Sequence, residues 1–198
     1  MIELKDGVTT FYAKSRKEWR KWLEKNHTKQ SSVWLIIYKK QSSVSSVYYR
    51  EAVDEALCFG WIDSKAIKRD TESYSQFFAR RNPKSNWSAV NKKKVKELIK
   101  DKLMMEAGLK AVATAKLNGK WNALDEIDKK IIPDDLRKAL DKNKTARQFF
   151  KGFSPSSAKG ILEWISNAKR PETRQKRIDE TVRLAAMNIK ANHPGQKK

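Results

Sequence analysis

The feature that most constrains the fold is an unbroken apolar run, Val-Trp-Leu-Ile-Ile-Tyr, at residues 33–38. A short, bounded run without alternation is typical of a strand that is buried on both faces. Residues 61–69 and 73–80 are also rich in Tyr, Phe and Ile but more polar, and Asp-Thr-Glu at 70–72 predicts a turn between them. We therefore expect a small sheet that contains a hairpin with one solvent-exposed face.

Helices are expected to alternate with these strands in the first half of the chain. A capping box at residues 15–18 predicts a short helix with two buried indoles. Apolar residues at helical spacing over 52–57 predict a second helix, which ends at Gly60. A third helix should begin at Ser85 or Ser88.

From residue 106 onward the strand signals largely stop, and apolar residues recur at helical spacing. Ser154-Pro155 and Pro171 each predict a helix start. The expected fold class is therefore α+β, with a sheet and packed helices at residues 1–105 and an all-helical region at 106–198. Because no Pro-, Gly- or Ser-rich linker separates the two parts, we expect the helical region to pack on or beside the sheet.

The charge of the chain restricts its partners. Among 198 residues, 44 Lys and Arg stand against 23 Asp and Glu, a formal net charge of +21. Such a charge attracts polyanions, so nucleic acid, an anionic small molecule and an anionic envelope component all stay open. No apolar stretch is long enough to span a membrane, and the first residues lack the apolar core of an export signal. A single cysteine, Cys58, fits a reducing compartment, and we expect the protein in the cytoplasm.

Four sequence blocks carry a family resemblance. They are WLIIYKK at 34–40, EAVDEALCFGWIDS at 51–64, SNWSAVN at 85–91 and AKRPETRQKR at 168–177. Together they resemble the YdeI/OmpD-associated family (OmdA-like), also called bacteriocin-protection proteins. The resemblance implies a role in stress resistance, as tolerance of bacteriocins or cationic antimicrobial peptides, with a porin link at the envelope. It implies no established enzymatic activity and supplies no catalytic residues.

Several kinds of catalytic and metal chemistry lack support in the sequence. One histidine, His27, follows a helix and the other, His193, lies in the tail, so we expect no metal and no cofactor. Cys58 stands late in an amphipathic helix beside Leu57 and Phe59, which favours a buried, inert thiol. The chain has neither a Gly-x-Ser-x-Gly elbow nor a glycine-rich phosphate loop. We therefore expect binding and not catalysis.

One polar cluster predicts an anion pocket. Its members are Trp61, Asp63, Ser64, Arg80, Arg81, Lys84, Ser85, Trp87, Ser88 and Asn91. If residues 61–69 and 73–80 form a hairpin, Asp63 and Arg80 become neighbours, and the next helix begins beside them with free N–H groups at residues 85–88. A helix N-terminus beside arginines and aromatic walls suits a phosphate or carboxylate group. The alternative is a structural Asp63–Arg80 ion pair, with both tryptophans in the core.

A second cluster is basic and lies where the last two helices meet. Its members are Lys169, Arg170, Arg174, Arg177 and Arg183. Residues 170, 174 and 177 share one helical face, which is either a phosphate-binding surface or simply a solvated one. Our leading hypothesis is binding of anionic partners in peptide tolerance. The alternatives are a nucleic-acid-binding protein that uses this basic face, and an enzyme for a small anionic ligand with Asp63 as acid/base and Arg80 as clamp.

Overall fold

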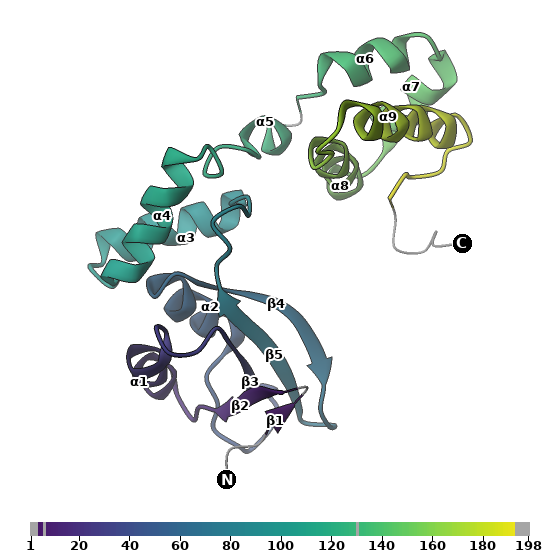
Figure 1. The fold of residues 1–198 in the computed structure, drawn as a ribbon. Helices are drawn as coiled ribbons and strands as arrows, with labels where there is room; N and C mark the ends of the chain where they lie inside the picture. Colours follow the sequence, from purple (N-terminus) through teal and green to yellow (C-terminus); the bar gives the residue numbers. More distant parts are fainter. Residues whose placement is uncertain (1–3, 6, 130, 193–198) are drawn as a thin grey trace. The chain divides into compact units, whose positions relative to one another are not determined.

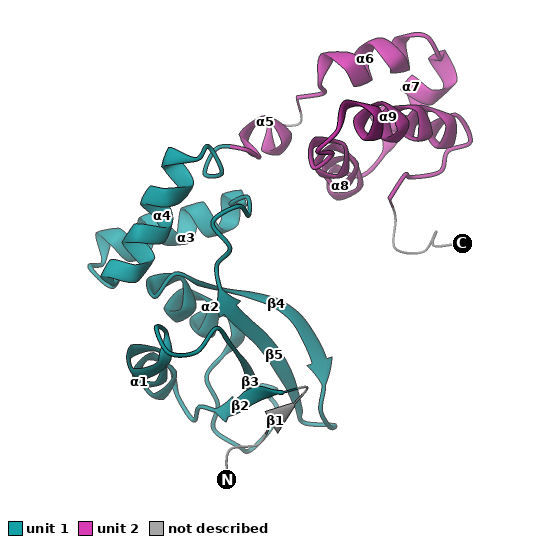
Figure 2. Ribbon diagram, in the orientation of Figure 1, with its two compact units in different colours: residues 1–122 teal, residues 123–198 magenta. Residues whose placement is uncertain are grey.

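The chain divides into two compact units in the computed structural model, which describes residues 4–5, 7–129 and 131–192 (Figure 2). Unit 1 is Met1–Asn122 and unit 2 is Ala123–Lys198. The sequence suggested a division at residue 105, and the observed division lies further along the chain. The reason is that the helix after residue 105 packs within unit 1. The sheet in unit 1 and the helices of unit 2 confirm the α+β prediction, whereas packing of the helical region on the sheet stays a prediction.

Unit 1 is built on a sheet with the strand order β1-β2-β3-β5-β4 (Figure 1). The strands are β1 (Leu4–Lys5), β2 (Val8–Tyr12), β3 (Ser32–Tyr38), β4 (Trp61–Lys68) and β5 (Ser73–Arg80). The β2–β3 pair is parallel, and the other neighbouring pairs are antiparallel. Every residue from Val33 to Ile37 is buried, which confirms the strand predicted from the apolar run. The predicted hairpin is also confirmed, as β4 and β5.

The helices of unit 1 are α1 (Arg16–Asn26), α2 (Tyr49–Cys58), α3 (Ala89–Lys100) and α4 (Glu106–Leu117). The predicted cap of α1 is confirmed, because the Ser15 hydroxyl accepts a hydrogen bond from the Glu18 N–H at 3.3 Å. Helices α1 and α2 lie along the sheet (Figure 1). Alternate side chains of β3 meet buried indoles from α1, β4 and the loop before α3 in one core, which contains Val33, Leu35, Ile37, Trp19, Trp61 and Trp87.

Two close contacts fix α2 against its neighbouring helices. A Cβ atom on Gly108 of α4 would lie 2.3 Å from the Cys58 carbonyl oxygen, so only glycine permits this crossing. Glu55 of α2 is 2% exposed, and its carboxylate lies 2.5 Å from Arg16 Nε and 2.7 Å from Arg20 Nη1 of α1. A buried carboxylate is stable only when it is paired and hydrogen-bonded, and these two arginines supply both conditions.

Unit 2 consists of short helices around a separate apolar core. They are α5 (Asp125–Asp128), α6 (Asp134–Asp141), α7 (Lys144–Gly152), α8 (Pro155–Ser166) and α9 (Pro171–Ala186). The helix starts predicted at Ser154-Pro155 and Pro171 are confirmed. An ion pair joins α9 to α6, with Arg174 Nε 2.6 Å from Asp135 Oδ2. Across the described parts of both units, no helix combines the length and the apolarity that a bilayer crossing requires.

Candidate functional site

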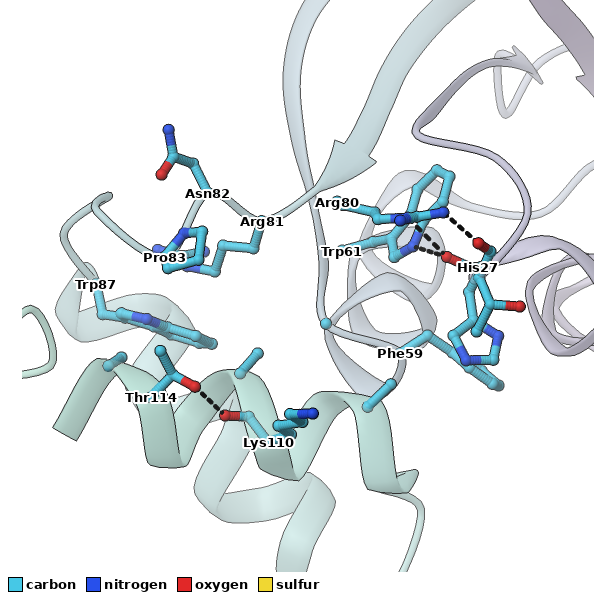
Figure 3. A pocket seen from close by; sticks show the side chains of 15 residues that line it. His27, Phe59, Trp61, Arg80, Arg81, Asn82, Pro83, Trp87, Lys110 and Thr114 are labelled. Carbon is cyan, nitrogen blue, oxygen red and sulfur yellow. Dashed lines mark hydrogen bonds between the residues drawn. The ribbon is translucent and has the colours of Figure 1, made fainter. Parts of the chain in front are cut away.

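A cavity of about 320 Å³ lies in unit 1, where the start of β4 and the end of β5 face α4 (Figure 3). The segment after α1 contributes His27 and Thr28, and the turn from α2 into β4 contributes Phe59, Gly60 and Trp61. The end of β5 and the loop after it contribute Arg80, Arg81, Asn82, Pro83 and Trp87. Helix α4 contributes Ala107, Lys110, Ala111, Thr114 and Ala115.

Arg81 has hydrogen-bonding capacity that the protein does not use. Its Nη2 donates to the Asn86 carbonyl oxygen at 2.6 Å, and its guanidinium carbon lies 3.7 Å from the centroid of the Trp87 ring. Its Nε and Nη1 are shielded from solvent, and no acceptor among the described residues pairs with them. Burial lowers the pKa of Arg81 to about 10, and the nearby Asp63 charge only partly opposes this effect.

Arg80 has a different role from its neighbour. Its Nε donates to the carbonyl oxygens of Gln30 at 2.8 Å and His27 at 3.0 Å, and its Nη2 donates to the Thr28 carbonyl oxygen. The Trp61 Nε1 also donates to the His27 carbonyl oxygen, at 3.3 Å (Figure 3). Arg80 therefore holds the chain segment that leaves α1, where a cation is also favoured by the helix dipole.

Small residues let the turn before β4 approach α4 closely at the cavity. Gly60 has φ +72°, and a Cβ atom there would lie 3.0 Å from the Ala107 carbonyl oxygen and 3.3 Å from the Ala111 Cβ. Any other residue would therefore be strained in its backbone and crowded against α4. The alanines that α4 presents to this turn leave room for a ligand.

The charges around the cavity have one sign. Arg80, Arg81 and Lys110 line it, and the lining within the described residues contains no Asp or Glu. The Nδ1 of His27 bonds to the Leu23 carbonyl oxygen at 2.8 Å, so Nδ1 carries the hydrogen. Thr114 Oγ1 donates to the Lys110 carbonyl oxygen at 2.9 Å. Such a lining favours an anion and disfavours a cation.

Four of the ten residues predicted for the pocket line this cavity: Trp61, Arg80, Arg81 and Trp87. The predicted Asp63–Arg80 contact is wrong, because the strand register pairs Arg80 with Trp61 and Asp63 with Phe78. Asp63 instead accepts a hydrogen bond from the Tyr49 hydroxyl at 2.6 Å. Asp63, the candidate acid/base residue, and Arg80, the candidate clamp, therefore bond to different partners.

The other predicted pocket residues lie outside the lining, and several already have structural hydrogen bonds. The Ser88 hydroxyl caps α3 by accepting from the Asn91 N–H at 3.3 Å. The Ser64 carbonyl oxygen accepts from Gln76 at 3.2 Å. The predicted free N–H groups are in use at two positions, since Ser85 donates to Asn82 and Trp87 donates to Lys120. Lys84 is exposed.

Sequence reasoning missed the contribution of α4 to the cavity. Ala107, Ala111 and Thr114 follow one another at spacings of four and three residues, which places them on one helical face. A stripe of small residues along one face of this helix was the available signal. Only the tertiary packing shows that this stripe faces the hairpin.

The basic cluster of unit 2 is partly structural. Arg174 Nε and Nη2 donate to the two carboxylate oxygens of Asp135 at 2.6 and 3.0 Å. Arg177 Nη1 donates to the Trp164 carbonyl oxygen, and its guanidinium carbon lies 5.1 Å from the centroid of that indole. Lys169, Arg170 and Arg183 are exposed. Nucleic-acid binding by this cluster stays a prediction.

Two further sequence expectations concern metal and thiol chemistry. Within the described residues, no three His, Cys, Asp or Glu side chains come together as metal ligands, and His193 lies outside those residues. Cys58 is fully buried, and burial raises the pKa of its thiol to about 11. Because the thiolate is the reactive form, this cysteine is a poor nucleophile at neutral pH.

Comparison with known families assigns the two units separately. Residues 11–111, just over half of the chain, match the family described as "Domain of unknown function (DUF8412)". The chain belongs to the DUF8412 family. Residues 130–188 match a second family, described as "Bacteriocin-protection, YdeI or OmpD-Associated". No curated protein and no solved structure matches significantly.

The family matches confirm the resemblance and also locate it. The block at 168–177 falls inside the YdeI/OmpD-associated match, so the chain is YdeI/OmpD-associated-like in its C-terminal part. The blocks at 34–40, 51–64 and 85–91 fall inside the DUF8412 match. The cavity therefore lies in the DUF8412 part of the chain, apart from the α4 residues that follow residue 111.

Proposed function

We propose that the protein binds a small anionic molecule in the cavity of unit 1. The observation that carries this proposal is Arg81, which lines a cavity without acidic residues while its Nε and Nη1 have no acceptor. Buried donors without a partner cost free energy, and such exceptions call for an explanation. A bound anion would offer these donors the acceptor that the described residues do not supply.

Binding and not turnover is the activity that these groups support. Three lining groups with exchangeable protons are already directed at backbone carbonyls: Arg80 at the segment after α1, His27 Nδ1 at Leu23 and Thr114 at Lys110. Asp63, the carboxylate considered as an acid/base group, lies outside the lining. A positioned acid/base pair, which catalysis of proton transfer requires, is therefore not assembled by these residues.

Titration calorimetry with inorganic phosphate and with acetate tests this proposal on the full chain. Arg81→Gln should weaken binding about ten-fold or more, because it removes the charge and the unpaired donors. Lys84→Gln is the matched control, since it removes one charge from an exposed neighbouring residue outside the lining. Equal losses in the two variants would show nonspecific attraction. If neither these two anions nor the aryl anions named in the next subsection bind saturably to wild type, the proposal is refuted.

At the level of the cell, we infer a role in tolerance of bacteriocins or cationic antimicrobial peptides. The YdeI/OmpD-associated match and the net charge of +21 support it, because a cationic protein competes for the anionic partners that such peptides seek. We propose a cytoplasmic location, supported by the single buried cysteine. Deleting the gene should raise sensitivity to these peptides, and wild type but not Arg81→Gln should restore tolerance. Unchanged sensitivity would refute the role, and fractionation of cells tests the location.

A further inference from the structure

We propose that the ligand of this cavity is a small carboxylate with an apolar body about the size of one aromatic ring, such as an aryl monocarboxylate. This inference rests on the proposed function and specifies its ligand. The volume of about 320 Å³ is at the lower end of the range for small-molecule sites. Liquid water occupies about 30 Å³ per molecule, so the cavity has room for roughly ten water-sized groups.

The walls show that the ligand has an apolar part. Phe59, Trp61 and Trp87 are buried aromatic residues of the lining, with Trp87 and Pro83 on one side and Phe59 and Trp61 on the other (Figure 3). The α4 side adds the methyl groups of its alanines. An apolar ring would bury the apolar part of this lining that is still accessible, which a bare inorganic anion would not do.

The cations indicate a single, planar anionic group. Arg80 is already bonded to three backbone carbonyls, which leaves Arg81 and Lys110 to receive the ligand's charge. Arg81 is stacked at 3.7 Å on Trp87 and is also held by Asn86, so its guanidinium has a fixed plane. A carboxylate brings a single charge and an acceptor oxygen for an unpaired N–H of this guanidinium.

Ala111 is the residue that sets the size of the apolar part. It lies on α4 opposite Gly60 and lines the cavity. A larger side chain at this position fills the space for the ring and leaves the guanidinium in place. Ala113, on an exposed part of the same helix, provides the matched control for helix propensity and bulk.

The test titrates benzoate, phenyl phosphate, acetate and inorganic phosphate against the full chain, with quenching of tryptophan fluorescence as the signal. Benzoate should bind about ten-fold or more tightly than acetate, because the ring adds buried apolar area. Ala111→Leu should weaken benzoate about five-fold or more and leave acetate unchanged, whereas Ala113→Leu should alter neither. Thr114→Leu is a second filling variant in case Ala111→Leu fails to fold.

Each contrary result has a distinct meaning. If acetate and phosphate bind through Arg81 but benzoate binds no more tightly, the apolar body is refuted and the proposed function stands. If phenyl phosphate binds much more tightly than benzoate, the carboxylate is refuted. If both filling variants fold and bind benzoate like wild type, the placement of the ring is refuted. If none of the four anions binds, or if Arg81→Gln binds all of them equally well, the proposed function fails as well.

Discussion

The guanidinium carbon of Arg81 lies 3.7 Å from the centroid of the Trp87 indole ring. This contact places a cation on an aromatic face inside the molecule, where the interaction is stronger than at an exposed site. It also fixes the direction in which the guanidinium can donate. The stack therefore stabilises the loop after β5 and also orients the guanidinium for binding an anion.

Replacing Arg81 with lysine separates charge from shape. Arg81→Lys keeps the positive charge but loses the planar stack on Trp87 and the geometry of the bond to Asn86. We expect an affinity for acetate and benzoate between those of wild type and Arg81→Gln, measured by calorimetry. Wild-type affinity in the lysine variant would mean that charge alone governs binding.

Gly108→Ala should destabilise unit 1. The new Cβ would lie 2.3 Å from the Cys58 carbonyl oxygen, so α4 must move away from α2. We expect a loss of about 1–3 kcal/mol in the free energy of unfolding, the usual cost of overpacking. Urea unfolding followed by tryptophan fluorescence measures it, since every tryptophan except Trp164 lies in unit 1.

A second glycine gives the opposite expectation and serves as the control. A Cβ on Gly160, within α8 of unit 2, meets nothing within 4 Å. Gly160→Ala should therefore stabilise unit 2 by about 0.5–1 kcal/mol through helix propensity alone. Destabilisation by this variant, or none by Gly108→Ala, would contradict the packing described for the two helices.

Glu55→Gln should cost about 3 kcal/mol of stability, because it leaves two arginines around a buried site without their counter-charge. Glu24→Gln is the matched control. It removes a carboxylate 3.5 Å from the same Arg20, but that carboxylate is 46% exposed, and exposed pairs contribute about 0–1 kcal/mol. Chemical denaturation of both variants measures the difference, and similar losses would show that Glu55 is not a buried link.

Unit 2 should be sensitive to acid through Asp135. Hydrogen bonding to the Arg174 guanidinium lowers the pKa of Asp135 below its ordinary value of 3.8. As the pH falls, the Asp135 carboxylate is therefore protonated in the unfolded chain before it is protonated in the folded protein. Its contribution to stability is complete above the pKa of the unfolded chain and is lost as the pH falls through the lower pKa of the folded protein. The stability difference between wild type and Asp135→Asn should be constant above about pH 5 and shrink below about pH 4. A difference that is constant from pH 2 to 6 would contradict this account.

The sequence was informative about local structure because the signals are themselves local. The apolar run at residues 33–38 could be buried only as a central strand, and the Ser15 cap defined the start of α1. The short β1 and β2 were missed because their burial depends on pairing with strands elsewhere in the chain. The boundary near residue 105 was placed too early, since α4 has the composition of the helices in unit 2 but packs on α2.

The site was predictable to the extent that it depends on one hairpin. Adjacent strands bring Trp61 and Arg80 together, which spacing alone could indicate. The predicted contact of Asp63 with Arg80 was wrong because Asp63 lies two residues further along β4 than Trp61, which is the residue paired with Arg80. Lys110 and the alanines of α4 could not be placed, since they reach the cavity through packing of a helix far along the chain.

The separate cores of the two units have a consequence for descent. Each unit has its own apolar core. The division between Asn122 and Ala123 falls between the two family matches and interrupts neither of them. A recombination event at this joint would cut through no hydrophobic cluster. A mutation in one core therefore leaves the packing within the other core unchanged.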